Sequence, residues 1–260
     1  MTKKKYSGET EIKHKIEELF SYRKLVGLLQ QGGLDKDKIF YAHLVDIQYQ
    51  IYLLDAYLEG QWVLDKSALA SCWDKIKESL SKLKYSSSQI DKLLREIREY
   101  ERIERNCRKG KWPTSVSFRN FYTTKSCDVR LIRHLIYDAQ PELNRIWKEK
   151  DWAYYDLITE MNDDIADIIE DLNTYNGNRF LISVLRKGSH KTEKQYGAYI
   201  DKITTKAKVY FKKHMEEGEN HQLFSWTMER SMETLDLLSK TIHNNDPSLF
   251  TKSLLLAKMK

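Results

Sequence analysis

Breaks in regular structure are scarce along this chain, because its 260 residues contain only 10 Gly and 3 Pro. Average usage would place roughly 30 of these two residues in a chain of this length. Sandwiches, propellers and doubly wound sheets need a turn every few residues, and Gly and Pro supply the backbone angles of those turns. The scarcity therefore predicts an all-α fold. The length suits a single large helical domain, 1–260, built as one bundle.

The hydrophobic content is high enough for a packed core. Hydrophobic residues make up 41% of the chain, with 6 Trp, 16 Tyr and 8 Phe, which excludes intrinsic disorder. No apolar run reaches membrane-spanning length, and the N-terminal segment lacks the apolar stretch of a secretory signal. We therefore expect a cytoplasmic protein with no transmembrane segment. Cys72, Cys107 and Cys127 lie far apart with no CxxC pair, which predicts buried thiols rather than disulfides or a thiolate metal site.

Helices are expected between the few breakers, with stop signals at Gly32-Gly33 and Gly60 and a start signal at Asp246-Pro247. The irregular segment from Arg108 to Ser117 is interpreted as a loop inside one bundle rather than a domain seam. The expected helices cover residues 10–30, 36–60, 66–83, 87–106, 118–138, 142–148, 151–175, 178–187, 191–216, 220–244 and 247–257.

The stretch DWAYYDLITEMNDDIADIIEDLNTYNGN, residues 151–178, contains eight acidic side chains and no Lys or Arg. It carries a charge of −8, so the rest of the chain must carry +14 to give the net +6. In helical register, seven of the acids share roughly 120° of arc and an apolar set lies opposite. The acids are Asp156, Glu160, Asp163, Asp164, Asp167, Glu170 and Asp171. The apolar set is Leu157, Ile158, Met161, Ile165, Ile168 and Leu172.

Two interpretations of this acidic arc are open. Like charges three or four positions apart destabilise a helix by a few tenths of a kcal/mol per pair, and no base in the stretch relieves them. The arc is either a surface stripe, solvated or paired with bases of a neighbouring helix, or a cation site. Carboxylates are the ligands that Mg²⁺ prefers, so the second interpretation predicts a Mg²⁺ site.

The spacing of the acids also matches a family pattern. Residues 163–167 read DDxxD, and residues 167–171 read DxxED, followed by Asn178-Arg179-Phe180-Leu181. This resembles the second aspartate-rich helix of class I isoprenoid synthases, in particular the squalene and phytoene synthase-like branch. The register of Asn162, Ala166 and Glu170 is similar to a metal-binding triad of the bacterial terpene cyclase-like branch, with Ala166 in place of a hydroxyl residue.

The resemblance implies a helical bundle around a central cavity and a Mg²⁺-dependent reaction on a prenyl diphosphate. About three Mg²⁺ ions would act as Lewis acids that ionise the diphosphate. The implied metal ligands are Asp163, Asp164, Asp167, Glu170 and Asp171, with Asp164 and Asp167 also assigned to catalysis. The carbocation would then cyclise or condense, as in a terpene synthase (a lyase) or a prenyl-diphosphate-using transferase.

Such enzymes carry a first acidic helix upstream, and the helix expected at 36–60 is the candidate. Asp46 lies on a face of this helix that is otherwise apolar and aromatic. A carboxylate buried on such a face is costly unless it is paired, hydrogen-bonded or metal-bound. The resemblance makes Asp46 a catalytic metal ligand, with Gln50 where the family shows a second Asp. The alternative is that a tyrosine hydroxyl satisfies Asp46.

Basic side chains suited to a diphosphate also occur, since charge-assisted hydrogen bonds are strong. By the resemblance, Lys125 together with Asp128 fits the position of a residue that senses the diphosphate, and Arg130 fits it as well. Arg179, Lys187 and Arg230 are further candidates. Equally open is that these bases balance the acidic arc across a helix interface. The aromatic side chains expected to line the substrate pocket, or else to be plain core, are Tyr49, Tyr57, Phe118, Tyr122 and Phe180.

Other function classes have weaker support. A di-iron bundle would need two Glu-x-x-His pairs, and only Glu11 to His14 offers one. No Walker, GxGxxG or nucleophile-elbow motif is present. A non-catalytic helical protein stays open as the alternative, binding either nucleic acid through the segment CRKGKWPTSVSFRNFY or a basic protein partner through the acidic arc. The sequence leaves open whether the chain forms a homodimer.

Overall fold

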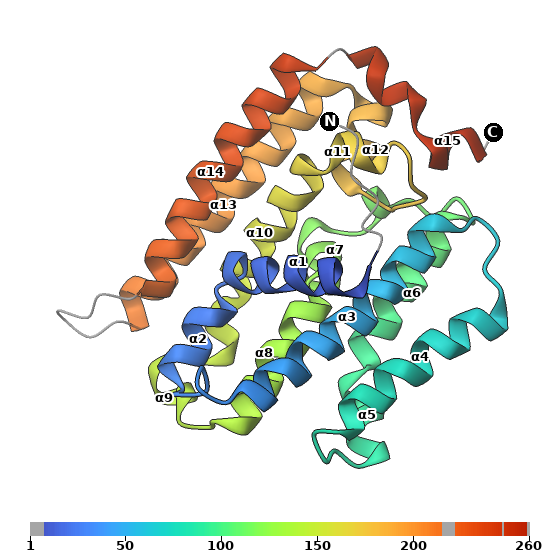
Figure 1. Cartoon of the computed structure of the whole chain (residues 1–260). Coiled ribbons are helices and arrows are strands. Elements are labelled where there is room, and N and C mark those ends of the chain that lie inside the picture. The colour runs from blue at the N-terminus through green and yellow to red at the C-terminus, as the bar shows by residue number, and fades with distance from the viewer. Residues whose placement is uncertain (1–7, 215–221, 246, 259–260) are drawn as a thin grey trace. The chain divides into compact units, whose positions relative to one another are not determined.

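We describe a computed structural model of the chain that covers residues 8–214, 222–245 and 247–258. Over these residues it contains fifteen α-helices, three short 3-10 helices and no β-strand (Figure 1). The predicted all-α fold is therefore confirmed.

The chain divides into two compact units. Unit 1 comprises the residues up to Arg102 together with Cys127–Glu149, and unit 2 comprises Ile103–Ser126 together with the residues from Lys150 onward. The predicted loop at 108–117 lies inside unit 2 and is not the point of division. The single domain expected for residues 1–260 stays a prediction.

Unit 1 is built around one long helix, α3 (Lys38–Gly60), which begins at an Asp37 cap that accepts hydrogen bonds from the backbone N–H groups of Ile39 and Phe40. The side chains of Leu44, Ile47, Ile51, Leu54 and Leu58 are buried, and α1, α4 and α8 pack against the helix. The other helices with residues in this unit are α1 (Glu9–Tyr22), α2 (Leu25–Gln31), α4 (Lys66–Ser81), α5 (Ser87–Leu93), the first part of α6 (Arg95–Cys107), α8 (Cys127–Ala139) and α9 (Leu143–Ile146).

The central element of unit 2 is α10 (Ala153–Ala166), which carries most of the acidic arc. It packs against α7, α12, α13 and α14. The apolar set predicted to face the core, from Leu157 to Leu172, is buried with aromatic side chains of these neighbours, as predicted. The helices of this unit are α7 (Phe118–Lys125), α10, α11 (Ile168–Asp171), α12 (Arg179–Lys187), α13 (Ser189–His214), α14 (Gln222–Asn244) and α15 (Leu254–Lys258). The 3-10 helices are η1 (Pro113–Ser115), η2 (Glu149–Trp152), which begins at the boundary between the units, and η3 (Pro247–Lys252).

Helices α10 and α14 run in the same direction. The Trp152 ring lies 6.2 Å from the Trp226 ring, and ten residues further along, Asn162 donates to the hydroxyl of Thr234 at 3.1 Å. Residues further toward the C-terminus of α10 therefore contact residues further toward the C-terminus of α14, as in a parallel pair of helices.

Several helices predicted as continuous are interrupted. Residues 10–30 break before Leu25, where Lys24 has a φ of 62°, and residues 87–106 break at Leu94. The predicted helices 118–138 and 151–175 break at Ser126 and Asp167. None of these positions is Gly or Pro, so tertiary packing rather than local propensity sets the breaks.

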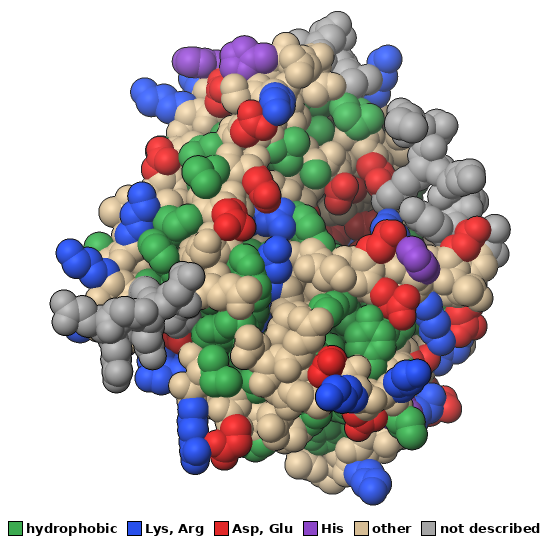
Figure 2. All heavy atoms as spheres, turned by 60° about the vertical axis from the view of Figure 1, so that its left-hand side comes forward, with side chains coloured by type: hydrophobic (Ala, Val, Ile, Leu, Met, Phe, Trp, Pro, Cys, Tyr) green, Lys and Arg blue, Asp and Glu red, His purple; other side chains and the backbone are tan. Residues whose placement is uncertain are grey.

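The surface carries charges of both signs, with hydrophobic side chains exposed between them on the face drawn in Figure 2. No helix in the described part of the chain is long and apolar enough to cross a membrane. The large hydrophobic side chains that are exposed are separated in sequence: Ile39, Val63, Ile146, Ile169, Val209 and Met232.

Candidate functional site

The candidate site is the acidic arc of α10 and α11, which is mostly buried inside unit 2. Asp156, Glu160, Asp164 and Asp171 are buried, Asp163 and Glu170 are half-buried, and only Asp167 is exposed; the remaining acid of the stretch, Asp151, is also buried. Buried charges are stable only when they are paired and hydrogen-bonded. The arc is therefore not a solvated surface stripe.

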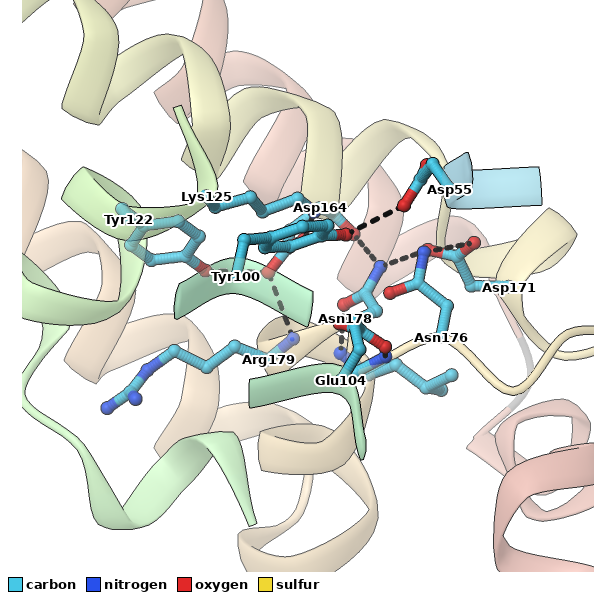
Figure 3. A network of polar contacts seen from close by, with 12 residues as sticks. Asp55, Tyr100, Glu104, Tyr122, Lys125, Asp164, Asp171, Asn176, Asn178 and Arg179 are labelled. Carbon is cyan, nitrogen blue, oxygen red and sulfur yellow. Dashed lines mark hydrogen bonds and ion pairs between the residues drawn. The ribbon is translucent and has the colours of Figure 1, made fainter. Parts of the chain in front are cut away.

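Asp164 is the centre of this network and has no solvent exposure. One carboxylate oxygen forms an ion pair with the Nζ of Lys125. The other accepts a hydrogen bond from the Tyr122 hydroxyl at 2.9 Å and one from the backbone N–H of Arg179 at 3.0 Å (Figure 3). Three donors from α7 and α12 thus fix this side chain of α10.

A second tyrosine extends the network. The hydroxyls of Tyr122 and Tyr196 lie 2.8 Å apart. Burial and the nearby charge of Asp164 raise the pKa of both phenols above the ordinary value, so both stay protonated. Because the Tyr122 hydroxyl donates to Asp164, its oxygen accepts the hydrogen bond from Tyr196. A chain of two hydrogen bonds therefore links α13 through α7 to α10.

Lys125 is the base shared by the buried carboxylates. Burial lowers the pKa of its ammonium, but the negative charges of Asp164, Glu160 and Asp171 outweigh burial and hold the pKa well above its usual value. Lys125 therefore stays charged. The ammonium group of Lys125 thus interacts with three buried carboxylates at once.

Asp171 is held by two amides from the turn that follows α11. Asn176 and Asn178 donate their Nδ2 groups to its two oxygens at 3.1 and 2.7 Å. Burial nevertheless raises the pKa of Asp171 to about 7, although the charge of Lys125 and the bond from Asn178 act in the opposite direction. The protein donors therefore leave this carboxylate only partly compensated.

Asn178 joins three elements through one side chain. Its Nδ2 donates to Asp171 and to the backbone carbonyl of Asp164, both at 2.7 Å, and its Oδ1 caps α12 by accepting from Leu181 N at 2.8 Å. At the preceding residue, Gly177, the backbone N–H donates to buried Glu104 at 3.1 Å. A Cβ at that position would lie 2.8 Å from Oε1 of the same carboxylate, so a larger residue would force the Glu104 side chain to shift.

The other predicted diphosphate bases have partners of their own. The Arg179 guanidinium donates to the carbonyls of Pro113 and of Val116, the latter at 2.7 Å, and lies 4.3 Å from the centre of the Phe118 ring. Arg230 is buried on α14 and pairs with Glu233 at 3.3 Å.

Two further predicted diphosphate ligands, Arg130 and Lys187, also contact other side chains. Arg130 belongs to unit 1, where it pairs with Glu96 at 2.6 Å. Lys187 donates to the side chain of Gln195 at 2.9 Å.

The contacts of Arg179 give one prediction for stability. Replacing Arg179 with Met keeps the aliphatic length but removes both donors to the loop carbonyls and the stacking on Phe118. We expect a loss of about 2–3 kcal/mol in the free energy of unfolding. Urea denaturation of both proteins measures this loss, and Arg186→Met, on the exposed end of the same helix, serves as the matched control. A loss no larger than that of the control would contradict the assigned contacts.

The predicted first-motif residues lie in unit 1. Asp46 accepts hydrogen bonds from Ser79 at 2.8 Å and Lys82 at 3.3 Å, and Lys13 lies 3.5 Å away. Burial would raise the pKa of Asp46, but the Ser79 bond and the two lysine charges lower it. A serine and two lysines therefore satisfy Asp46, and the tyrosine partner that the alternative expected is absent from its described contacts.

The remaining first-motif and pocket residues are placed as follows. Gln50 is half-buried one turn beyond Asp46, and the Tyr49 ring lies 5.3 Å from the Lys13 ammonium. The Tyr57 hydroxyl accepts from the backbone N–H of Asp65 at 2.8 Å. Asp128, also in unit 1, accepts a hydrogen bond from Gln48 at 2.8 Å.

The other three pocket candidates are brought together in the core of unit 2. Phe118 and Phe180 each lie 4.9 Å from the Tyr196 ring, and Phe118 lies 6.2 Å from Tyr122. Their packing is that of a hydrophobic core. Tyr196 itself was not predicted, although it lies on the apolar side of α13 with Ile200 and Ile203 at helical spacing.

The metal ligands that the resemblance implies on α10 and α11 do not form a ready-made cage. Within residues 8–214, 222–245 and 247–258, no group of three or more His, Cys, Asp or Glu side chains is arranged to hold a metal ion. Asp164 and Asp171 are held by protein donors, whereas Asp163, Asp167 and Glu170 keep contact with solvent. Comparison with protein-family models, with curated proteins and with solved structures finds no match to this chain.

Proposed function

We propose that the protein is a Mg²⁺-dependent isoprenoid synthase that ionises a prenyl diphosphate and cyclises or condenses the carbocation. The observation that supports this most is the concentration of carboxylates on α10 and α11. The buried carboxylates of Asp164, Glu160 and Asp171 all act on the ammonium group of Lys125, and three further acids of the arc, Asp163, Asp167 and Glu170, keep contact with solvent. Hard divalent cations are the partners that such oxygen donors favour.

The acids form two sets with different tasks. The inner set, Asp164 and Asp171, positions α7, α12 and the turn that joins α11 to α12. The outer set, Asp163, Asp167 and Glu170, consists of oxygen donors three or four residues apart with access to solvent, and its chemistry fits Mg²⁺. Because the described residues do not arrange them as a cage, these acids would hold the ion together with substrate oxygens and water. When bound, Mg²⁺ supplies Lewis acid chemistry for departure of the diphosphate.

The existing contacts of the bases in unit 2 limit which of them could bind a diphosphate. Arg179 and Arg230 use their guanidinium groups for loop carbonyls and for Glu233. Lys125 stands among the carboxylates and keeps its charge. Lys125 is itself paired with Asp164, so it would support a diphosphate by sharing its ammonium group between that carboxylate and the phosphate oxygens. We assign Lys125 this role, and the outer acids the role of ligands to the metal ion that contacts the diphosphate.

The burial of the arc also argues against the alternative of an acidic docking stripe. A basic protein partner would have to reach Asp156, Glu160, Asp164 and Asp171, all of which lie inside unit 2. Only the outer set could make such a contact.

A thermal-shift measurement with a nonreactive thio-analogue of a prenyl diphosphate tests the proposal. At about 100 times its Kd a ligand stabilises by about 2.7 kcal/mol, which corresponds to roughly 5–10 °C in Tm for a chain of this size. We expect this shift only when Mg²⁺ and the analogue are both present. Asp167→Asn should remove it, and Asp236→Asn, an exposed acid on α14, should keep it. No Mg²⁺-dependent shift in the unmodified protein would overturn the proposal.

A further inference from the structure

The outer face of α13 carries an unusual concentration of lysine. The helix runs from Ser189 to His214 and contains seven Lys, no Arg and only two acids, Glu193 and Asp201. Its formal charge is therefore +5. The lysines are Lys191, Lys194, Lys202, Lys206, Lys208, Lys212 and Lys213.

These lysines lie opposite the buried side of the helix. The buried side runs from Thr192 through Tyr196 to Phe211 and packs in unit 2, where α13 lies beside α14 (Figure 1). In helical register the lysines share roughly 160° of arc on the other side. All seven are exposed, with Ala198 and Val209 exposed between them.

Ion pairing is the second feature of the lysine face. Some lysines elsewhere pair along their own helix, as Lys240 does with Asp236 at 2.6 Å. Within the described part of the chain, none of the seven α13 lysines has a carboxylate partner. The acids of neighbouring α14 are engaged on that helix, for example Glu233 with Arg230. Like charges at this spacing repel, so an anionic partner would stabilise the face.

We propose that α13 lies on the surface of a membrane that contains anionic lipids and holds unit 2 there through its lysine face. Lys191 and Lys213 are separated by about 33 Å along the helix axis, so the row meets many headgroups of a flat surface at once. Clusters of four to eight basic residues on a helix are typical of binding to anionic headgroups. Because the apolar side of α13 is used in the core, the contact is electrostatic and the helix does not insert.

A nucleic acid fits this face less well. Arginine forms bidentate contacts with phosphate, and the face has none. Single strands bind by base stacking on exposed aromatic side chains. The tyrosines of α13 are directed inward: Tyr196 is buried, and Tyr199 stacks on Phe118 at 4.5 Å. This inference is independent of the proposed enzymatic function, since it depends on α13 alone.

Vesicle co-sedimentation of the full chain tests the proposal. We expect binding to vesicles of phosphatidylcholine mixed with phosphatidylserine, loss of binding at high salt, and no binding to phosphatidylcholine alone. Substituting four lysines by Gln should weaken binding on the order of 10²–10³-fold. The four positions are Lys191, Lys194, Lys202 and Lys212. A control with the same loss of charge replaces exposed lysines of unit 1, namely Lys36, Lys38, Lys66 and Lys75, and should bind within a few-fold of the unmodified protein.

Three outcomes would overturn the proposal. The first is an absence of binding to anionic vesicles at low salt. The second is an equal loss of binding in the α13 variant and the unit 1 variant, which would mean that net charge alone is sensed. The third is binding to DNA or RNA that the α13 variant loses, without any binding to vesicles, which would assign the face to nucleic acid. Circular dichroism melting of both variants establishes that they are folded.

Discussion

Replacing Asp164 with Asn is expected to lower the free energy of unfolding by about 3–5 kcal/mol, the cost of removing one partner from a buried ion pair. The change leaves the Lys125 ammonium in the interior without its contact and weakens the bonds from Tyr122 and the Arg179 backbone. Urea denaturation followed by circular dichroism measures this loss.

Two companion variants make the result specific. Asp167→Asn changes an exposed acid three residues away and should alter stability by less than about 0.5 kcal/mol. Lys125→Met combined with Asp164→Leu removes this ion pair but also takes the shared ammonium group away from Glu160 and Asp171, so we expect a loss at least as large as that of Asp164→Asn. Equal losses for Asp164→Asn and Asp167→Asn would contradict the central position of Asp164.

The fold and part of the site could be predicted from the sequence because they depend on local periodicity. The scarcity of Gly and Pro predicts helices, and the alternation of Leu157, Ile158, Met161 and Ile165 with acids predicts which side of α10 is buried. The suggestion that bases balance the acidic arc across a helix interface holds for Lys125, which pairs with Asp164. These inferences need only the 3.6-residue period and the cost of unpaired charge.

What could not be predicted depends on how segments distant in sequence return to α10. The capping role of Asn178 follows from its place before α12, but its bonds to Asp164 and Asp171 require the turn at 172–178 to fold back on α10. Arg179 resembles a diphosphate ligand by spacing, yet its guanidinium reaches the carbonyl of Val116, sixty-three residues earlier in the chain. No local pattern encodes such a pairing, and the break at Asp167 has no breaker residue to mark it.

The stability of the protein should also depend on pH through Asp171. Its pKa in the folded chain is about 7, against about 3.9 for an unfolded Asp, so folding favours the protonated carboxyl. Below the lower value both states are protonated and the contribution is fully present. As the pH rises toward 7 the unfolded state loses its proton first, and the free energy of unfolding falls by at most about 4 kcal/mol.

Other groups titrate over the same pH range. The test therefore compares the pH dependence of the free energy of unfolding between the unmodified protein and matched variants. Asp171→Asn cannot lose a proton and keeps a polar side chain near Asn176 and Asn178. In EDTA, we expect the free energy of unfolding of this variant to change less between about pH 4 and 7 than that of the unmodified protein. The stability of the variant relative to the unmodified protein should therefore increase as the pH rises. The control Asp236→Asn, at an exposed site on α14, should follow the unmodified protein. Parallel pH profiles for Asp171→Asn and the unmodified protein would show that the carboxyl of Asp171 is ionised throughout, and that Lys125 and the two amides suffice to compensate its burial.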